Sequence, residues 1–254
     1  MASHVLRVSV AGCFVLTACS SGSQSASPGA STSGGSTEVG DSGASGVDAS
    51  AAAESDSGVD AGPACPGVPI VPDDTGYVAS GSNPLGITGS WFVYSDCADL
   101  DGVNCSMVTT PDAGGFPNDG GVMCTSGTTS TASGAWGAGI ALELNDGPPQ
   151  MPFDTVDAGI TGFCFQLTGP TIPSTGVRVA FPTEDNNDNA YFKAVYTAGQ
   201  HTVLFSQTAQ GSWVTDPQPF EPTAVTLIQF QIPSSSTAPI PWNFCVGGLT
   251  AVVQ

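Results

Sequence analysis

Apolar and polar residues alternate along short segments in the C-terminal two thirds of the chain. Residues 140–144 carry an apolar side chain at every second position, and residues 177–181 do the same. A period of two places successive side chains on opposite faces of an extended strand. These segments therefore predict strands that turn one face to a core and the other to water or to a ligand.

Runs of β-branched and aromatic residues recur between clusters of Gly, Pro, Asp and Ser, and helical patterns are nearly absent. The runs predict about eight strands, which together predict an all-β protein folded as a β-sandwich. The predicted strands cover residues 88–95, 135–144, 159–168, 176–182, 190–196, 201–205, 223–232 and 242–253. Residues 96–133 form a polar, Gly-rich insertion, and we expect its order to depend on disulfides.

The N-terminus has the pattern of a bacterial lipoprotein signal. Arg7 makes the start weakly positive, residues 8–16 are apolar but too short to span a bilayer, and Leu16-Thr17-Ala18-Cys19 matches a lipobox. We expect a signal peptide at residues 1–18, with Cys19 as the lipidated first residue of the mature chain. The alternative is an ordinary secretory signal cleaved nearby, with Cys19 incidental.

Residues 19–62 are almost entirely Ser, Gly, Ala, Thr, Asp and Glu. Such a composition buries too little surface to fold, so we expect a lipid-anchored, disordered linker before a folded domain at residues 63–254. Ser20, which follows the lipidated cysteine, favours sorting to the outer membrane. The protein is thus expected in the envelope of a Gram-negative bacterium, held at the outer membrane or cell surface by its lipid.

The net charge of the chain limits the classes of molecule that it can bind. The chain has 22 acidic residues, three basic ones and a net charge of -19. Nucleic acid is excluded because phosphate binding needs clusters of Lys and Arg, and anionic lipid is a poor target for the protein surface itself. Acidity of this kind keeps a surface solvated, with divalent cation binding as the alternative. Arg178 and Lys193 are expected to neutralise nearby carboxylates, the alternative being contact with a polar ligand.

Eight cysteines divide into two groups. Cys13 lies in the signal peptide and Cys19 is the lipid acceptor, which leaves six for disulfides in an oxidising compartment. The six candidates are Cys65, Cys97, Cys105, Cys124, Cys164 and Cys245. They allow 15 connectivities; we favour Cys164 with Cys245, both in strand-like runs, and the others within the N-terminal third. A zinc site is the alternative, but the chain has no CxxC pair.

Aromatic and glycine-containing motifs occur throughout the folded region. They are Gly89-Ser90-Trp91-Phe92-Val93-Tyr94-Ser95-Asp96, Ala135-Trp136-Gly137-Ala138-Gly139-Ile140, Phe153-Asp154, residues 159–165, 177–182, 211–213 and 227–231, and a closing strand at 244–252. This set resembles the landmarks of galactose-binding-like jelly rolls, and is most similar to the carbohydrate-binding-module-like domains of myxobacterial-type surface lipoproteins. The resemblance implies a jelly-roll sandwich and a non-catalytic polysaccharide-binding role.

Members of the family that this chain resembles often bind a structural calcium through an Asp-Asp pair in their last strand. This chain has Gly247 and Gly248 at the matching positions. Two loops still carry oxygen ligands suited to calcium, namely residues 184–189 and the set Asp96, Asp99, Asp101 and Asn104. We favour solvated turns rich in Asx residues, with a structural calcium site as the alternative. No other cofactor is expected.

Sugar binding needs exposed aromatic rings beside groups that hydrogen-bond hydroxyls. We expect Trp91 and Trp136 to pack in the core and Trp213 to be exposed, because it follows Gly211-Ser212 before a Pro-rich segment. The candidate ligand-binding residues are Trp213, Tyr94, Glu143, Gln166 and Arg178.

No catalytic motif accompanies these residues. His201 lacks any Gly-x-Ser-x-Gly or HExxH pattern, and a glycosidase pair of Glu143 with Glu184 or Glu221 is of a kind that any acidic chain offers. We therefore expect no enzymatic activity. Two functions remain: a glycan-binding module, and a structural or protein-interaction lipoprotein without a small ligand. Exposed aromatics on one sheet favour the first, and burial of all four tryptophans the second.

Overall fold

The computed structural model describes residues 65–111, 121–146, 151–186 and 189–254. The predicted signal peptide, Cys19 and the linker at residues 19–62 lie outside the described residues. Within the described ranges, no helix has both the length and the apolar character needed to cross a membrane.

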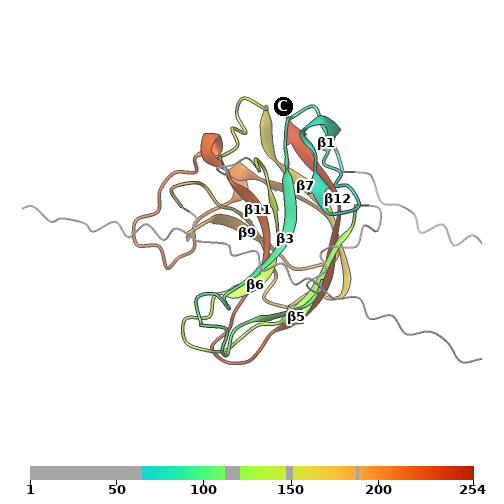
Figure 1. The fold of residues 1–254 in the computed structure, drawn as a ribbon. Coiled ribbons are helices and arrows are strands. Elements are labelled where there is room, and N and C mark those ends of the chain that lie inside the picture. Colours follow the sequence, from blue (N-terminus) through green and yellow to red (C-terminus); the bar gives the residue numbers. More distant parts are fainter. Residues whose placement is uncertain (1–64, 112–120, 147–150, 187–188) are drawn as a thin grey trace, which may run out of the picture. The chain divides into compact units, whose positions relative to one another are not determined.

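Two antiparallel sheets pack face to face as a β-sandwich (Figure 1). The first sheet has the order β10-β7-β12-β5-β4, with β1 paired to β12. Its strands are β1 (Val68–Pro69), β4 (Met107–Thr110), β5 (Met123–Thr128), β7 (Ile160–Thr171), β10 (Gly199–Leu204) and β12 (Pro241–Val253).

The second sheet has the order β2-β3-β6-β11-β8-β9. Its strands are β2 (Tyr77–Val78), β3 (Gly89–Ser95), β6 (Gly137–Glu143), β8 (Val177–Phe181), β9 (Tyr191–Val195) and β11 (Leu227–Pro233). Short 3₁₀ turns occur at η1 (Ser80–Ser82), η2 (Phe205–Gln207) and η3 (Pro222–Ala224).

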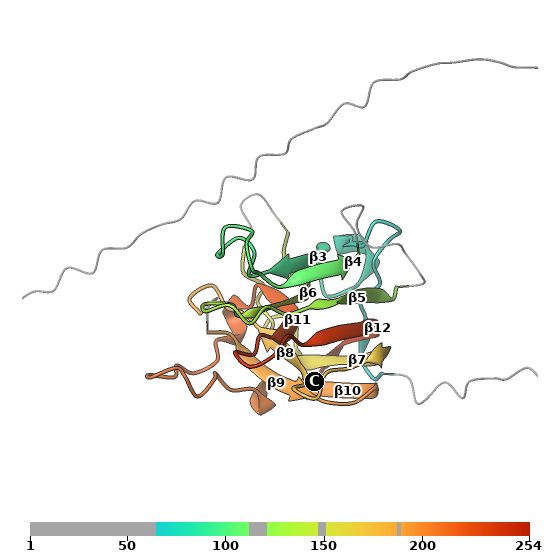
Figure 2. The same ribbon diagram turned by 90° about the horizontal axis from the view of Figure 1, so that it is seen from below.

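The strand order is that of a jelly roll. From β5 onwards, each strand passes to the opposite sheet, except for the hairpin between β8 and β9, so that β5-β12-β7-β10 faces β6-β11-β8-β9 in this order. Figure 2 shows the two rows of strands side by side. This arrangement joins two Greek keys, and β3 and β4 extend it at one end.

All eight predicted strands are present, and the prediction of an all-β sandwich is confirmed. Residues 96–133, for which no strand was predicted, contain β4 and β5, and two of the three disulfides involve cysteines of this segment. Met123–Thr128 pairs residue by residue with the first half of β12, from Pro241↔Thr128 to Val246↔Met123. Its small polar side chains lack a strand signature, so pairing with a neighbour, not local propensity, makes it a strand.

Phenylalanines from both sheets fill the space between them. Phe165 of β7 meets Phe230 of β11 edge to face with centroids 5.0 Å apart, and Phe163 stacks on Phe181 at 5.8 Å. All four are fully buried, as is Phe244 of β12. Trp91 and Trp242 also lie in this core. Successive side chains of a strand point to opposite faces of the sheet, so the residues between these core residues lie on the two outer faces.

Three disulfides join the six predicted cysteines, but the favoured pairing of Cys164 with Cys245 is wrong. Cys164 pairs with Cys65, Cys245 with Cys124, and Cys97 with Cys105. Cys124 and Cys245 lie directly opposite each other on β5 and β12, with Cα atoms 3.9 Å apart. The missed strand β5 therefore accounts for the error, because it supplies the nearest partner of Cys245.

Candidate ligand-binding face

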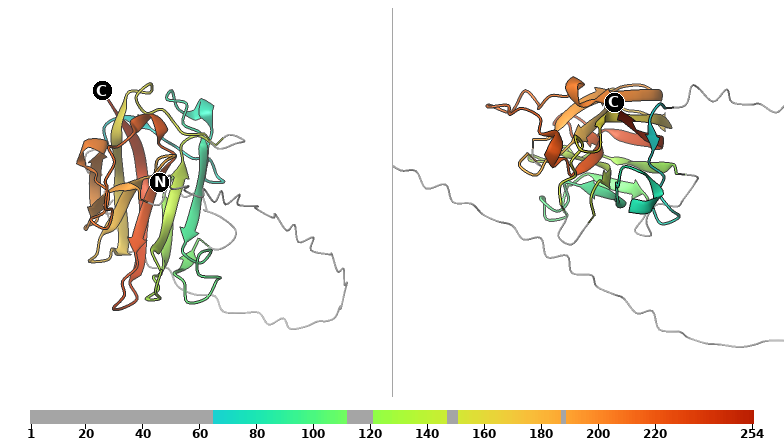
Figure 3. Two further views of the ribbon diagram at one scale, coloured as in Figure 1. Left: turned by 90° about the vertical axis from the view of Figure 1, so that its left-hand side faces the viewer. Right: turned by 90° about the horizontal axis from the view of Figure 1, so that it is seen from above.

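The left-hand view of Figure 3 looks onto the outer face of the second sheet. Most of the predicted binding residues lie on or beside this face. The strand register sets two rows across five strands. The first row is Phe92, Ala141, Gln229, Ala180 and Phe192, and the second is Tyr94, Gly139, Gln231, Arg178 and Ala194. We call this surface, with Trp136 and Trp213 at its margins, the aromatic face.

The residue types on the aromatic face follow a pattern from edge to edge. Small residues occupy much of the middle, where Ala141 is 0% exposed and Ala180 is 4% exposed beneath larger neighbours. Large rings stand on β3 and β9. Adjacent strands are about 4.8 Å apart, so these two strands lie roughly 19 Å apart across the sheet. The face therefore presents two aromatic groups, with two glutamines and an arginine on the strands between them.

Trp213 lies beside β9 and forms the first aromatic group with Phe192. Their rings are nearly parallel, with centroids 5.8 Å apart and 11° between the planes. Trp213 keeps 57% of its surface exposed, which confirms the expectation that it faces solvent. A side chain at position 211 would begin 2.1 Å from the indole ring, so the glycine there lets Trp213 fold back over its own loop.

The loop that carries Trp213 is tied to its neighbours. It connects β10 to β11 and reaches out beyond β9 in Figures 1 and 2. The side chain of Gln210 donates a 2.9 Å hydrogen bond to the carbonyl of Asn189 and accepts one of 2.8 Å from the amide of Gln218. The two ends of the exposed segment are thereby fixed, which holds the indole in position over Phe192.

Tyr94 and Trp136 form the second aromatic group. Their rings stack with centroids 5.9 Å apart, and Phe92 lies 6.4 Å from Tyr94. The Trp136 indole N–H donates a 2.6 Å hydrogen bond to Asp99. Trp136 is 37% exposed, so the expectation that it packs in the core is wrong, whereas Trp91 at 6% does pack there. Trp136 lies just before β6, so the inward and outward alternation of the strand does not set the direction of its side chain. Its ring stacks on Tyr94 at the outer face.

The hydroxyl of Tyr94 is buried and has no hydrogen-bond partner among the described residues. Burial raises the pKa of this phenol, and the nearby charge of Arg178 acts in the opposite direction. Tyr94 and Arg178 occupy the same row, separated by Gly139 and Gln231. Tyr94 as a whole is partly exposed, whereas its hydroxyl oxygen is buried.

Arg178 lies next to the first aromatic group. Its guanidinium carbon is 4.8 Å from the centroid of Phe192 and 5.1 Å from that of Trp213, which are cation–π distances. Burial lowers the pKa of Arg178, and the phenols of Tyr196 and Tyr94 oppose that shift.

The expected neutralisation of carboxylates by the two basic residues is not seen in the described part of the chain. Arg178 has no carboxylate at ion-pair distance there, and the charges that bear on it are those of tyrosines. The Lys193 ammonium donates to the side-chain oxygen of Gln207 at 2.7 Å. Lys193 pairs with Val179 and so lies on the other side of β9 from Phe192.

Glu143 and Gln166 differ in their placement. Glu143 ends β6 on the same side as Ala141, so it lies at one end of the aromatic face. Burial, followed by the charge of Asp146, raises the pKa of its carboxyl, which a hydrogen bond from the backbone of Ser90 opposes. Gln166 is exposed on β7 of the first sheet and therefore lies apart from the aromatic face.

Two further residues belong to the face but were not among the predicted binding residues. Phe192 lies within a predicted strand, and Gln231 follows Gln229 at the spacing that places both on one side of β11. The alternation of each strand gave the signal for them. What the sequence did not show is the order of strands, which brings Gln231 beside Arg178 and Phe192 beneath Trp213.

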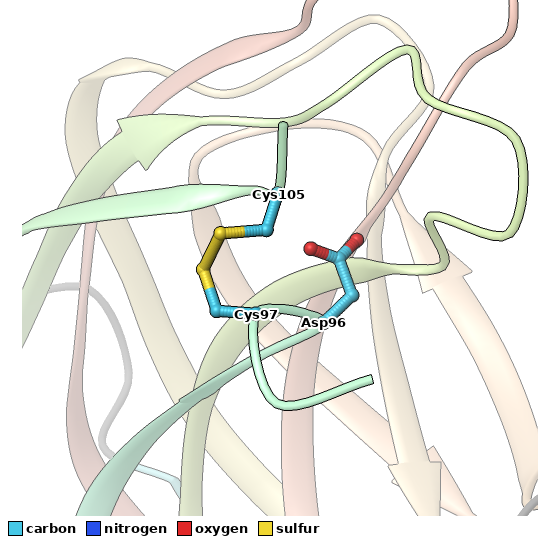
Figure 4. Close-up of side chains that lie close together, drawn as sticks. All are labelled: Asp96, Cys97 and Cys105. Carbon is cyan, nitrogen blue, oxygen red and sulfur yellow. A yellow bond between two sulfur atoms is a disulfide. The ribbon is translucent and has the colours of Figure 1, made fainter. Parts of the chain in front are cut away.

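The carboxylate of Asp96, the first predicted calcium ligand, accepts hydrogen bonds within the fold. Its Oδ1 accepts from the amide of Ser106 at 2.6 Å, and its Oδ2 accepts from the Ser106 hydroxyl at 2.9 Å and the Gly137 amide at 2.8 Å. Among the described residues, the His, Cys, Asp and Glu ligand atoms that lie close enough for one ion are those of Asp96, Cys97 and Cys105. Figure 4 shows that the two sulfurs form a disulfide beside the carboxylate.

The other predicted calcium ligands serve the turn and the aromatic face. Asp99 accepts the hydrogen bond from Trp136. Asp101 and Asn104 adopt positive φ angles of 51° and 54°, which Asp and Asn tolerate better than most residues. The backbone carbonyl of Asn104 accepts from the hydroxyl of Ser130.

A separate cavity of about 540 Å³ lies at the end of the sandwich near the C-terminus. Its lining is mostly apolar and includes Ile160, Phe205, Phe220 and Gln254. None of the predicted binding residues lines it. The cavity therefore lies apart from the aromatic face.

Comparison of the chain with protein-family models, with curated proteins and with solved structures found no match.

Proposed function

We propose that the folded domain is a non-catalytic glycan-binding module that uses the aromatic face. The observation that carries the proposal is the stack of Trp213 on Phe192. The indole packs on the ring of Phe192, yet Trp213 remains 57% exposed. Exposing so large an apolar ring costs hydrophobic free energy unless a ligand covers it. A fixed, exposed and flat ring is the surface on which the apolar face of a pyranose packs.

Polar groups beside the rings complete the chemistry. Gln229 and Gln231 are half-buried on β11, between the two aromatic groups. Their amides can both donate to and accept from sugar hydroxyls, and the guanidinium of Arg178 adds donors. The distance of roughly 19 Å between β3 and β9 suits an oligosaccharide rather than a single ring.

We further propose that the lipobox at Cys19 holds this module at the outer membrane or cell surface. The support is the sequence pattern of the signal peptide and of the linker at residues 19–62. A linker between the lipid and the folded domain would let a binding face reach polymers that do not touch the membrane. In this arrangement the module captures or displays glycans, and the resemblance to galactose-binding-like jelly rolls agrees with that role.

The test is binding to a glycan array, followed by titration calorimetry on the best ligand, with the intact folded region. We expect Trp213→Ala to weaken binding roughly fivefold to a hundredfold, since loss of stacking on an aromatic ring costs on the order of 1–3 kcal/mol. Met107→Ala is the matched control, because Met107 is also 57% exposed but lies on β4 of the first sheet. A second pair is Gln231→Ala against Gln166→Ala.

The result distinguishes the two functions. Loss of binding in Trp213→Ala and Gln231→Ala, with both controls unchanged, supports the glycan-binding module. If all four variants bind equally, the aromatic face is not the binding site. Absence of any bound glycan for the unmodified protein overturns the proposal in favour of a structural or protein-interaction lipoprotein. Bound glycans recovered at full length would agree with a non-catalytic role.

A further inference from the structure

Arg178 has an environment that is unusual in a chain of this charge. The sequence holds 22 acidic residues against three basic ones. In the described ranges the guanidinium nevertheless makes neither an ion pair nor a hydrogen bond, and its contacts are the rings of Phe192 and Trp213. Burial of a charge is unfavourable unless the charge is paired. The five N–H donors of Arg178 therefore remain available to a ligand that carries the missing negative charge.

The hydroxyl of Tyr94 is a second group that lacks a partner. It is buried, it belongs to the same row as Arg178, and it finds no acceptor in the described structure. The amide of Gln231 lies between the two in the register. The Tyr94 hydroxyl is buried, so the groups that face a ligand are the guanidinium of Arg178, which only donates, and the amide of Gln231, which donates and accepts. The unpaired guanidinium matches an anionic group better than it matches the hydroxyls of a neutral sugar alone.

We propose that the aromatic face binds acidic polysaccharides and that Arg178 holds the carboxylate of a hexuronate residue. The proposal rests on the glycan binding proposed above and specifies its ligand. The planar fork of a guanidinium pairs with both oxygens of a carboxylate, while Trp213 supplies the platform for the sugar ring. The net charge of -19 repels densely sulfated chains, which favours uronates spaced among neutral sugars.

The experiment compares one ligand in two charge states. A uronate-containing oligosaccharide that binds on the array is titrated before and after its carboxyl groups are reduced to primary alcohols. We expect reduction to weaken binding to the unmodified protein roughly tenfold to a hundredfold, the range for a hydrogen bond to a charged group. Because this comparison uses the unmodified protein, it does not depend on whether an Arg178 variant folds.

Variants then assign the effect to the residue. Arg178→Gln is expected to bind the carboxylate form and the reduced form equally, and Arg178→Lys to recover part of the difference, since it restores the charge but not the fork. Lys193→Gln is the matched control, because it removes the same charge from a side chain that bonds to Gln207 outside the face. Thermal unfolding checks that each variant is folded.

The outcomes separate this inference from the proposed function. If the reduced ligand binds as tightly as the carboxylate form, the uronate assignment is overturned while glycan binding stands. If sulfated polysaccharides bind as well as uronates, the assignment to a carboxylate is also overturned. If no glycan binds, the proposed function fails and this inference fails with it. Loss of the preference in Arg178→Gln but not in Lys193→Gln supports the proposal.

Discussion

The carboxylate of Asp96 accepts a 2.8 Å hydrogen bond from the backbone amide of Gly137, and so ties the end of β3 to the start of β6. The same carboxylate accepts from both the amide and the hydroxyl of Ser106, just before β4. Asp96 is completely buried. It therefore fixes the point where the end of β3, the start of β6 and the start of β4 meet.

Asp96→Asn should destabilise the fold by about 2 to 4 kcal/mol, because the amide brings an N–H against backbone N–H donors and loses the charge that strengthens these bonds. Urea denaturation measures the change in the free energy of unfolding. Asp99→Asn is the control: its partner is the exposed Trp136, and we expect about 1 kcal/mol or less. Equal losses in the two variants would contradict the structural role of Asp96.

The three disulfides should differ in their contribution to stability. Cys124–Cys245 closes a separation of 121 residues and Cys97–Cys105 one of 8. Loop-closure entropy then predicts about 5 kcal/mol for the first and about 2.5 kcal/mol for the second. We expect the double alanine variant at 124 and 245 to show the larger fall in urea midpoint. Peptide mapping under non-reducing conditions verifies the pairing, and a Cys164–Cys245 peptide would contradict it.

Glu143 should make stability depend on pH. Burial and the charge of Asp146 raise the pKa of its carboxyl, so the folded state binds this proton more tightly than the unfolded state does. Ionisation therefore lowers the free energy of unfolding as the pH rises above the ordinary value of 4.5. We expect Glu143→Gln to raise the thermal midpoint at neutral pH and to have no effect near about pH 3.

The control for Glu143 is Glu184→Gln, since Glu184 is exposed in the segment after β8. This variant should leave the midpoint nearly unchanged at both pH values. A gain for Glu143→Gln that persists in acid would show that packing, and not charge, causes it.

Calcium removal should leave the thermal midpoint unchanged. The Asp96 carboxylate already accepts three hydrogen bonds of 2.9 Å or less, and the Asp99 carboxylate accepts one from Trp136. These oxygens are thus occupied by protein donors. The measurement is a melt with calcium and with excess chelator. A midpoint that falls on chelation would show that the loop of residues 96–104 or that of residues 184–189 binds the ion.

Strand alternation was sufficient to predict much of the aromatic face. Residues 177–181 alternate strongly, which identified Arg178 as an outward side chain, and Trp213 was expected to be exposed from its glycine-containing loop. Trp136 was misassigned because it precedes its strand, where no alternation decides its direction. Gln166 was included because a strand pattern shows that a side chain points outward but does not show from which sheet.

The sequence by itself determined that this protein is built from short strands, because the spacing of apolar residues is a local property. It also determined the acidic composition and the six cysteines available for disulfides, and residues 16–19 predict a lipobox. Tertiary structure decided the order of the strands, and with it the strand at Met123–Thr128, the partner of Cys245 and the row that places Arg178 near Tyr94. These features depend on pairing between segments far apart in the chain, which local composition does not encode.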